Sequence, residues 1–173
     1  MANASRGRTG SEILKPLRSK FEFTELEERD NRRTWLTIKK EILLDFMKEV
    51  KKIGFAHCSI ISVTDWPNQG VFELTYHLWS YQYQIALTVK TKIQRGTPRI
   101  ESVYPVWGKS AGIHERELHE LFGVKFTGNP DLAPLFLEDW NGPPPFRKDF
   151  DWRKYVREEY YDKTRERERP YWD

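Results

Sequence analysis

Two histidines and two glutamates lie close together in the segment His114–His119, and these residue types can bind zinc or transfer protons. A zinc-hydrolase helix carries its two metal-binding histidines four positions apart, so that both lie on one face. In this chain they are five positions apart. That spacing turns one histidine about 140° away from the other on a helix. One helix cannot direct both side chains at one ion, so we expect no metal site here.

The same helix places a glutamate on its predicted apolar face. With Ile113 as the reference direction, Glu117 falls about 40° away, within the arc of the leucines. Outside that arc fall Glu115, Arg116, His119 and Glu120. A buried carboxylate needs a cation and hydrogen bonds, because an unpaired buried charge costs several kcal/mol. We therefore expect Glu117 to be mostly buried and paired with Arg147 or Lys148.

The hydrophobic pattern predicts the elements that position these side chains. It indicates strands at residues 35–38, 55–63, 72–79 and 83–89, a helix at 41–53 and a second helix at 111–122. Gly54 and Gly123 follow the two helices, where glycine is favoured as a cap. This order predicts an α+β fold: a small, mostly antiparallel sheet packed against helices, with an extended proline-rich segment and N- and C-terminal tails.

Charge is distributed unevenly along the 173 residues, whose formal net charge is +3. Residues 1–20 carry five basic groups and one acid, so the rest of the chain is close to neutral. We expect an N-terminal basic arm at 1–30, one α+β domain at 31–150 and a charged aromatic tail at 151–173. The basic arm is either a solubilising segment or a docking segment, and the sequence leaves both open.

Composition excludes several classes of protein. Cys58 is the only cysteine, so this chain alone forms no disulfide, cysteine-ligated iron–sulfur cluster or multi-thiolate zinc site. Its apolar runs are too short to span a bilayer, and the N-terminus lacks the apolar centre of a signal peptide. We expect a cytoplasmic protein. Few Cys and Met beside abundant Glu, Lys and Arg favour a thermophilic source.

The C-terminal third combines a rigid segment with many aromatic residues. Three prolines at 143–145 hold an extended segment that cannot join a central strand. The tail carries Trp152, Tyr155, Tyr160, Tyr161, Tyr171 and Trp172 among mixed charges. Because Tyr, Trp and Arg are enriched at interface cores, we favour a tail that wraps a partner over one that folds onto its own domain.

A long ordered pattern carries a family resemblance. It consists of Glu115-Arg116-Glu117, Phe122-Gly123 and Pro130-Asp131-Leu132, followed by Asp139-Trp140 and Arg147-Lys148-Asp149. This pattern resembles the NuoC-type subunit family of respiratory complex I, in the variant found in archaeal membrane-bound nickel–iron hydrogenase and sulfane-sulfur reductase complexes. The chain departs from the family at Asn129, often a histidine there, and at Ala133-Pro134, where basic residues are common.

The resemblance implies a subunit without a redox centre of its own. Such a subunit packs beside a large subunit with a nickel–iron or quinone-type site and near a small iron–sulfur subunit, at the cytoplasmic face of the membrane. It helps to hold the arm whose electron transfer drives ion pumping. We expect no cofactor in this chain and no nucleic-acid partner. The expected interface residues are Glu115, Arg116, Glu117, His119, Phe122, Pro130, Asp131, Trp140, Arg147, Lys148, Trp152, Tyr155, Tyr160, Tyr161 and Trp172.

Three other functions remain open at this stage. The chain could belong to an NADH:quinone oxidoreductase proper. It could be an independent acid–base enzyme that uses Glu117, His114 or His119, provided that two of these groups meet in one cleft. It could also be an RNA-binding sheet with Tyr76 or Tyr83 as stacking platforms, although the nearly neutral domain counts against this.

Overall fold

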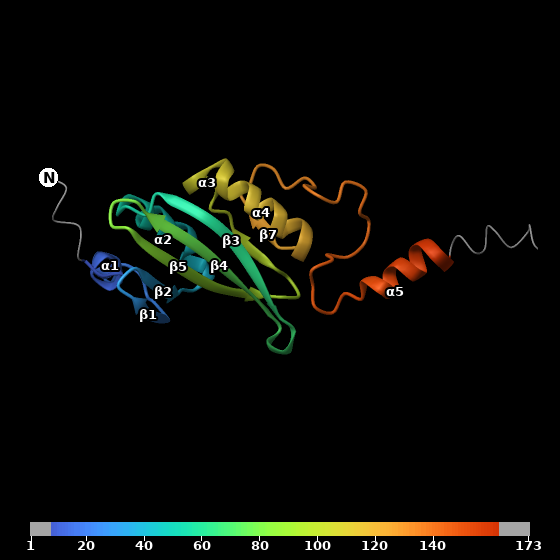
Figure 1. Cartoon of the computed structure of the whole chain (residues 1–173), viewed down its shortest axis with the longest axis horizontal. Coiled ribbons are helices and arrows are strands. Elements are labelled where there is room, and N and C mark those ends of the chain that lie inside the picture. Colours follow the sequence, from blue (N-terminus) through green and yellow to red (C-terminus); the bar gives the residue numbers. More distant parts are fainter. Residues whose placement is uncertain (1–7, 163–173) are drawn as a thin grey trace, which may run out of the picture.

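A five-stranded mixed sheet forms the centre of the computed structural model, which describes residues 8–162 (Figure 1). Its strand order is β1 (Glu25–Asp30), β2 (Arg33–Thr37), β5 (Ile85–Gln94), β4 (Val71–Ser80) and β3 (His57–Trp66). All neighbours are antiparallel except β2 and β5, which run parallel. β6 (Arg99–Glu101) and β7 (Lys125–Thr127) form a separate parallel pair. The predicted α+β class is confirmed.

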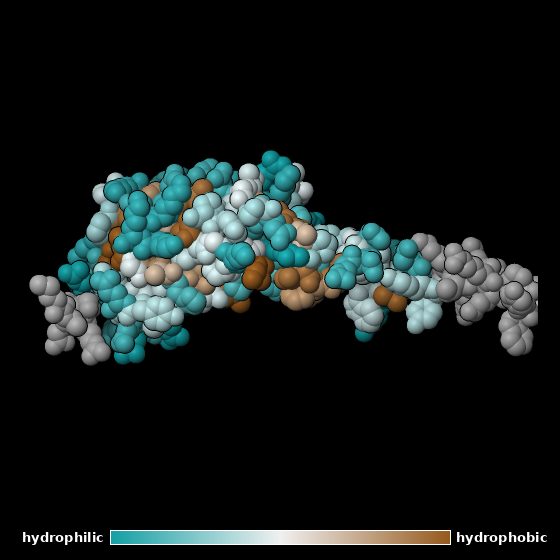
Figure 2. All heavy atoms as spheres, turned by 90° about the horizontal axis from the view of Figure 1, so that it is seen from above, coloured by the Kyte–Doolittle hydropathy of each residue, from teal (hydrophilic) through white to brown (hydrophobic). Residues whose placement is uncertain are grey.

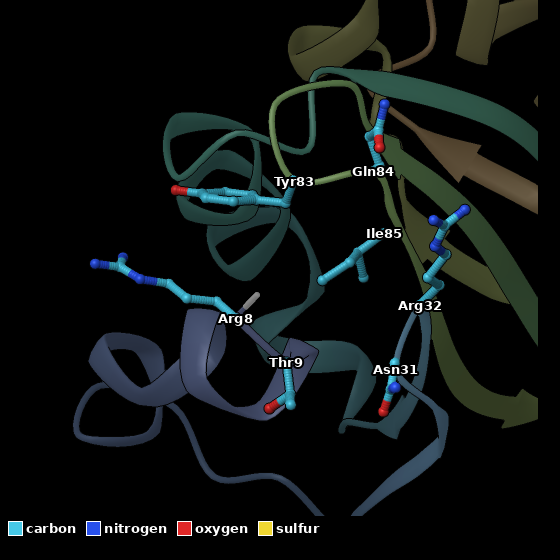
Figure 3. A pocket seen from close by; sticks show the side chains of 7 residues that line it. All are labelled: Arg8, Thr9, Asn31, Arg32, Tyr83, Gln84 and Ile85. Atoms are coloured by element: carbon cyan, nitrogen blue, oxygen red, sulfur yellow. The ribbon is translucent and has the colours of Figure 1, made fainter. Parts of the chain in front are cut away.

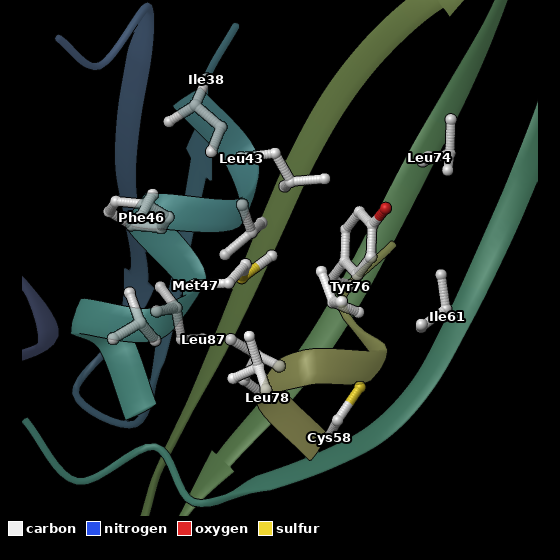
Figure 4. Packing of buried hydrophobic residues seen from close by; sticks show 14 of the residues in the cluster. Ile38, Leu43, Phe46, Met47, Cys58, Ile61, Leu74, Tyr76, Leu78 and Leu87 are labelled. Carbon is white, nitrogen blue, oxygen red and sulfur yellow. The ribbon is translucent and has the colours of Figure 1, made fainter. Parts of the chain in front are cut away.

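Alternation along the long strands decides which face of the sheet is buried. In β4, Phe72, Leu74, Tyr76 and Leu78 point into the core, as the sequence pattern predicts. Figure 4 shows Tyr76 and Leu78 packed among core side chains that include Met47 and Leu87. Burying Tyr76 removes its ring from solvent, so the predicted role of Tyr76 as an RNA-stacking platform is wrong.

Helices cover the apolar face of the sheet. A short 3-10 turn (Lys40–Ile42) leads into α2 (Leu43–Lys52), which buries four apolar side chains at helical spacing: Leu43, Phe46, Met47 and Val50. Burying each of these side chains contributes roughly 1.5–3 kcal/mol. α3 (Tyr104–Trp107) and α4 (Lys109–Phe122) follow β6, and α4 packs against the edge strand β3.

The N-terminal segment is an integral part of the domain from Gly10 onward. Residues 10–18 form α1, which Thr9 begins with a capping box formed with Glu12. The apolar side of α1 buries Ile13, Leu14 and Leu17 in the core. The expectation of a loose basic arm is therefore wrong for the part of residues 1–30 that carries α1 and β1. Residues 1–7 lie outside the described part of the chain.

Several strand boundaries differ from the sequence prediction. The strand predicted at 83–89 is β5, which continues to Gln94, and β1, β6 and β7 were not predicted. β3 continues beyond the predicted end at residue 63, through Asp65 and Trp66, and the turn that follows is a 3-10 segment at Pro67–Gln69. Gly70 ends that turn with a left-handed backbone (φ +65°). The extension of β3 matters because it places Asp65 inside the sheet.

A C-terminal arm extends from the end of the domain. It consists of α5 (Trp152–Val156) and a π-helical turn (Arg157–Asp162), and it projects away from the sheet in Figures 1 and 2. Asp151 caps α5 by accepting hydrogen bonds from the backbone of Arg153 and Lys154. Within residues 8–162, none of the helices has the length and apolarity that crossing a bilayer requires.

Candidate partner interface

α4 carries the sequence motif and fixes the direction in which each motif residue points. Its buried face consists of Ala111, Gly112, Glu115, Leu118 and Leu121. Gly112 packs so tightly that an added Cβ would lie 2.7 Å from the Tyr104 ring. The helix ends at Gly123, whose left-handed backbone (φ +76°) forms the predicted cap.

Glu115 is fully buried and is the centre of a polar network. Its carboxylate accepts hydrogen bonds from Ser102 Oγ (2.5 Å), from the backbone N–H of Val103 (2.7 Å) and from Asn129 Nδ2 (2.9 Å). Burial raises the pKa of Glu115, and the three hydrogen bonds partly offset that rise. These hydrogen bonds join α4 to the segment that follows β6 and to the loop at Asn129, so Glu115 acts within the domain.

The predicted pairing of Glu117 with Arg147 or Lys148 is wrong, whereas its predicted burial agrees with a side chain that is largely shielded from solvent. Glu117 forms no hydrogen bond or ion pair with the described residues. The error lies in the reference direction of the helix, because Ile113 is 54% exposed and does not face the core. The small residues Ala111 and Gly112 are the sequence feature that could have identified the buried face of α4, because small residues allow close packing.

The outer side of α4 holds the loop that follows β7. Arg116 donates to the backbone carbonyls of Ala133 and Pro134 and lies 3.2 Å from the carboxylate of Asp131. One turn later, Glu120 accepts hydrogen bonds from three consecutive backbone N–H groups, those of Leu135, Phe136 and Leu137. A loop without regular structure is thereby fixed by two side chains of one helix.

The C-terminal end of α4 positions the segment after the prolines. Arg147 Nε donates to the carbonyl of Phe122 (2.9 Å), and its guanidinium lies over the Phe72 ring (5.4 Å to the centroid). Phe122 itself packs edge-to-face against Phe72 and Phe146. His119 Nδ1 donates to the carbonyl of Val124 at 2.9 Å. These contacts place Arg147 and His119 in structural roles within the chain.

A second buried carboxylate contacts the same end of the proline-rich segment, at the residue after Arg147. Asp65 is buried and accepts from Arg95 Nε (2.8 Å) and Nη2 (3.1 Å) and from the backbone N–H of Lys148 (2.9 Å). Burial alone would raise the pKa of Asp65, but these hydrogen bonds outweigh it and hold the pKa below its ordinary value. Arg95 also pairs with Asp149. No sequence pattern indicates this triad, because its members are separated by β4 and by the long loop.

The base of the C-terminal arm is held by an aromatic cluster. Trp140, Phe150 and Tyr155 have ring centroids 4.8–5.9 Å apart. The indole N–H of Trp140 donates to the carbonyl of Pro143 at 2.9 Å. Two of the predicted interface residues, Trp140 and Tyr155, thus pack against each other and connect α5 to the domain.

The remaining aromatic side chains of this region are exposed. Trp152, Tyr160 and Tyr161 are 57–65% exposed on the arm. Phe136 (64%) and Phe146 (59%) are exposed on the loop, and no sequence pattern singled them out. Figure 2 shows the arm beyond the body of the domain, with apolar residues separated by hydrophilic ones. Trp172 and Tyr171 lie outside the described residues.

A shallow pocket of about 260 Å³ adjoins the outer side of α4. Pro130 and Asp131 line one wall, and Tyr104, Lys109 and Ile113 line the other. Among residues 8–162, no group of three or more His, Cys, Asp or Glu side chains could hold a metal ion. The geometry thus presents a fixed surface made by α4, the loop at 129–150 and the arm.

The family assignment agrees with this architecture. The model for the family described as respiratory-chain NADH dehydrogenase, 30 Kd subunit, matches residues 36–156. That range contains the sheet from β2 onward, α4, the loop and α5. The chain belongs to this family.

Two relatives identify the complexes in which similar chains occur. The chain is 39% identical over 100 residues to the C subunit of the F(420)H(2) dehydrogenase of Methanosarcina mazei, covering 57% of this chain and 63% of that protein. It is 35% identical over 116 residues to the C subunit of the NADH-quinone oxidoreductase of Moorella thermoacetica, covering 66% and 78%. The match thus spans less than two thirds of the M. mazei relative.

Solved structures share the fold. A chain of the membrane-bound sulfane sulfur reductase, an archaeal respiratory membrane complex, superposes with a TM-score of 0.79 at 34% identity over 87% of this chain and 91% of that one. The trypsin-resistant fragment of Nqo5 superposes with a TM-score of 0.60 at 27% identity, covering 70% of this chain and 98% of the fragment.

Proposed function

We propose that this chain is a non-catalytic structural subunit in the hydrophilic arm of a membrane-bound redox complex related to complex I. The observation that supports this most strongly is the set of exposed aromatic side chains on the loop that α4 holds and on the adjoining helix α5. Exposed large apolar residues on an ordered surface favour a protein partner, because they lower the free energy of binding when buried. The proposed surface consists of Phe136, Phe146 and Trp152.

The proposed partners are a large subunit with a nickel–iron or quinone-type site and a small iron–sulfur subunit. The redox centres would belong to these subunits, and this chain would contribute their relative placement at the cytoplasmic face of the membrane. Contact with the ion-pumping membrane subunits would be indirect. A ferredoxin-dependent hydrogenase or sulfur reductase is the favoured type, because the sulfane sulfur reductase chain covers 87% of this chain. A dehydrogenase proper is the second candidate, favoured by the sequence relatives.

The side chains of the alternative acid–base enzyme do not all converge on one side of α4. His114 and Glu117 lie about 60° apart around the helix, but no hydrogen bond joins them among the described residues. Glu117 and His119 are two positions apart on α4, which directs them about 160° away from each other. His119 is engaged with the Val124 carbonyl. A cleft that uses both Glu117 and His119 would therefore need a rearrangement of α4.

Recovery of the native complex tests the proposal. In the source organism, a tagged wild-type chain is expected to recover a large and a small redox subunit at constant stoichiometry. The variant Phe136→Ser/Phe146→Ser is expected to lose most of this recovery while keeping the circular dichroism spectrum of the folded chain. The matched control, Ile60→Ser/Tyr81→Ser, removes two exposed apolar side chains elsewhere and should recover both subunits. Equal recovery by both variants would contradict the proposed surface.

A further inference from the structure

A second surface lies at the end of the molecule opposite the C-terminal arm, where α1 and the turn between β1 and β2 meet the sheet (Figure 1). Three adjacent hollows occur there. The first, of about 610 Å³, is lined by Arg8, Asn31 and Arg32 together with the turn that leads into β5. Figure 3 shows Arg8 reaching outward on the side of Tyr83, with Arg32 on the other side, beside Gln84.

Neighbouring hollows share lining residues, and the three together are called the groove below. The first shares Asn31 and Arg32 with a second hollow of about 640 Å³, in which Trp79 forms part of the lining. The second shares Arg33 and Ala86 with a third of about 530 Å³, which Trp35 and His77 also line. The groove thus runs from the start of α1 around the β1–β2 turn onto the sheet face opposite the core.

Positive charge dominates the lining of this groove. Four arginines line it, Arg8, Arg29, Arg32 and Arg33, whereas Asp30 is the one acid among the described residues of the lining. Asp30 is already paired with Arg33 at 2.7 Å. The guanidinium groups of Arg8 and Arg32 form no ion pair with any residue of 8–162, so two exposed cations remain available.

Nearby carboxylates already have partners within the chain. Glu27 pairs with Arg29 at 3.0 Å, and Glu28 accepts a hydrogen bond from the backbone N–H of Ser11 at the start of α1. These acids therefore compete little for a ligand in the groove. The lining matches an elongated anionic partner, because guanidinium groups bind carboxylates through paired hydrogen bonds.

The aromatic residues distinguish an acidic protein segment from a nucleic acid. The ring of Trp35 already has Arg29 at 4.5 Å and Lys90 at 4.8 Å from its centroid. A base that stacked on Trp35 would have to displace these cations. The chain beyond residue 20 is also close to neutral in net charge. Binding of a nucleic acid usually requires an excess of positive charge that can contact many phosphates, so this charge balance does not favour a nucleic-acid ligand.

We infer that this groove, lined by Arg8, Arg32 and Arg33, binds an extended acidic segment of a partner protein. The inference goes beyond the proposed function, because the groove and the exposed aromatic surface lie at opposite ends of the molecule. A short segment rich in Glu or Asp would place carboxylates opposite Arg8 and Arg32 and its backbone along the β1–β2 turn.

Titration of the full chain with a fluorescein-labelled oligoglutamate peptide tests this inference by anisotropy. Wild-type protein is expected to bind the peptide saturably, with weaker binding as salt increases. The variant Arg8→Glu/Arg32→Glu is expected to bind about tenfold more weakly, since it replaces two attractive contacts with repulsive ones. The control Arg99→Glu/Lys125→Glu carries the same change in net charge on exposed residues of β6 and β7 and should bind like wild type.

Three results would overturn the inference. These are the absence of saturable binding to wild type, an equal loss in both charge-reversed variants, and tighter binding of an oligouridine probe that depends on Arg8 and Arg32. Either of the first two results would show that the groove does not bind acidic peptides specifically. The third would show that the groove binds nucleic acid instead. Phe136→Ser/Phe146→Ser should bind the peptide normally, so failure of the proposed function and failure of this inference give different results.

Discussion

At the scale of single residues, the molecule depends on two buried carboxylates whose partners come from distant segments. Within residues 8–162, Glu115 pairs with no cation and is satisfied by three neutral donors. Asp65 has a bidentate arginine and a backbone N–H. Their pKa shifts accordingly have opposite signs, since burial dominates at Glu115 and hydrogen bonds with Arg95 and Lys148 together outweigh burial at Asp65.

Removal of the Glu115 carboxylate is expected to destabilise the fold. Glu115→Ala leaves the N–H of Val103 and the amide of Asn129 without their acceptor and creates a cavity, so we expect a loss of about 3 kcal/mol in the free energy of unfolding. Glu115→Gln keeps the volume and one acceptor oxygen, and we expect a loss of about 1 kcal/mol. Urea denaturation of both variants measures the difference. Equal losses in the two variants would contradict this expectation.

Asp65 is expected to make stability depend on pH. Its folded-state pKa lies below the ordinary value of 3.8, so its contribution is present above that pH and is lost as the pH falls through the folded value. Asp65→Asn removes the charge opposite Arg95, and we expect it to cost about 3 kcal/mol at pH 7. Below about pH 3.8 the difference from wild type should shrink. Denaturation at neutral and acidic pH checks this, and a constant difference would contradict it.

Residue-level prediction from the sequence succeeded for local patterns and failed for helix phase. The alternation of β4 placed Phe72 and Leu74 in the core because a strand has a period of two. On α4, an exposed isoleucine gave the wrong reference direction, so Glu117 was assigned the buried position that Glu115 occupies. Asp65 could not be assigned at all, because its partner Arg95 reaches it only after β4 and β5 have paired.

At the scale of elements, the end of α4 combines a backbone requirement with close packing. Gly123 has a left-handed backbone, and a Cβ there would lie 2.9 Å from both Arg147 Nη2 and Pro144 Cγ. Gly70 has a similar backbone (φ +65°) but nothing within 4 Å of the added Cβ. Substitution of Gly70 therefore measures the free-energy cost of the backbone conformation alone. Substitution of Gly123 measures that cost together with the cost of steric contact.

Alanine at these two positions is expected to have unequal effects. Gly70→Ala should cost about 1 kcal/mol, since only the backbone is strained. Gly123→Ala should cost about 2 kcal/mol or more, because it also displaces Arg147 and the proline-rich segment. Thermal unfolding of both variants measures the gap. If Gly123→Ala is no more destabilising than Gly70→Ala, the proline-rich segment is not held at the end of α4.

The sequence predicted the long strands, two helices and the α+β class, whereas α1, α3 and the short strands β1, β6 and β7 were not predicted. Helical spacing located α2 and α4, and glycine marked both C-terminal ends. The N-terminal segment was misassigned because its basic residues suggested an arm, although Ile13, Leu14 and Leu17 occur at helical spacing and pack into the core. The loop at 131–137 has no pattern of its own, since α4 imposes its shape through Arg116 and Glu120.

At the scale of the whole molecule, a rigid domain presents different surfaces at its two ends. One end carries Phe136, Phe146 and the arm, and the other carries the arginine-lined groove. The family pattern in the sequence predicted which family the chain belongs to, and the match over residues 36–156 confirms it. The interface assignment stays a prediction, because contact with a partner depends on residues of that partner.

Turnover of the assembled complex is the most direct test of a non-catalytic role. In a strain that lacks the native copy, we expect the variant His114→Ala/Glu117→Gln to support wild-type electron transfer per assembled complex, because neither side chain would take part in the chemistry. Phe136→Ser/Phe146→Ser should instead lower the amount of assembled complex. Total activity should fall by the same factor, so that the activity per assembled complex stays unchanged. Normal assembly of His114→Ala/Glu117→Gln with turnover abolished would contradict the account and make these residues part of the reaction.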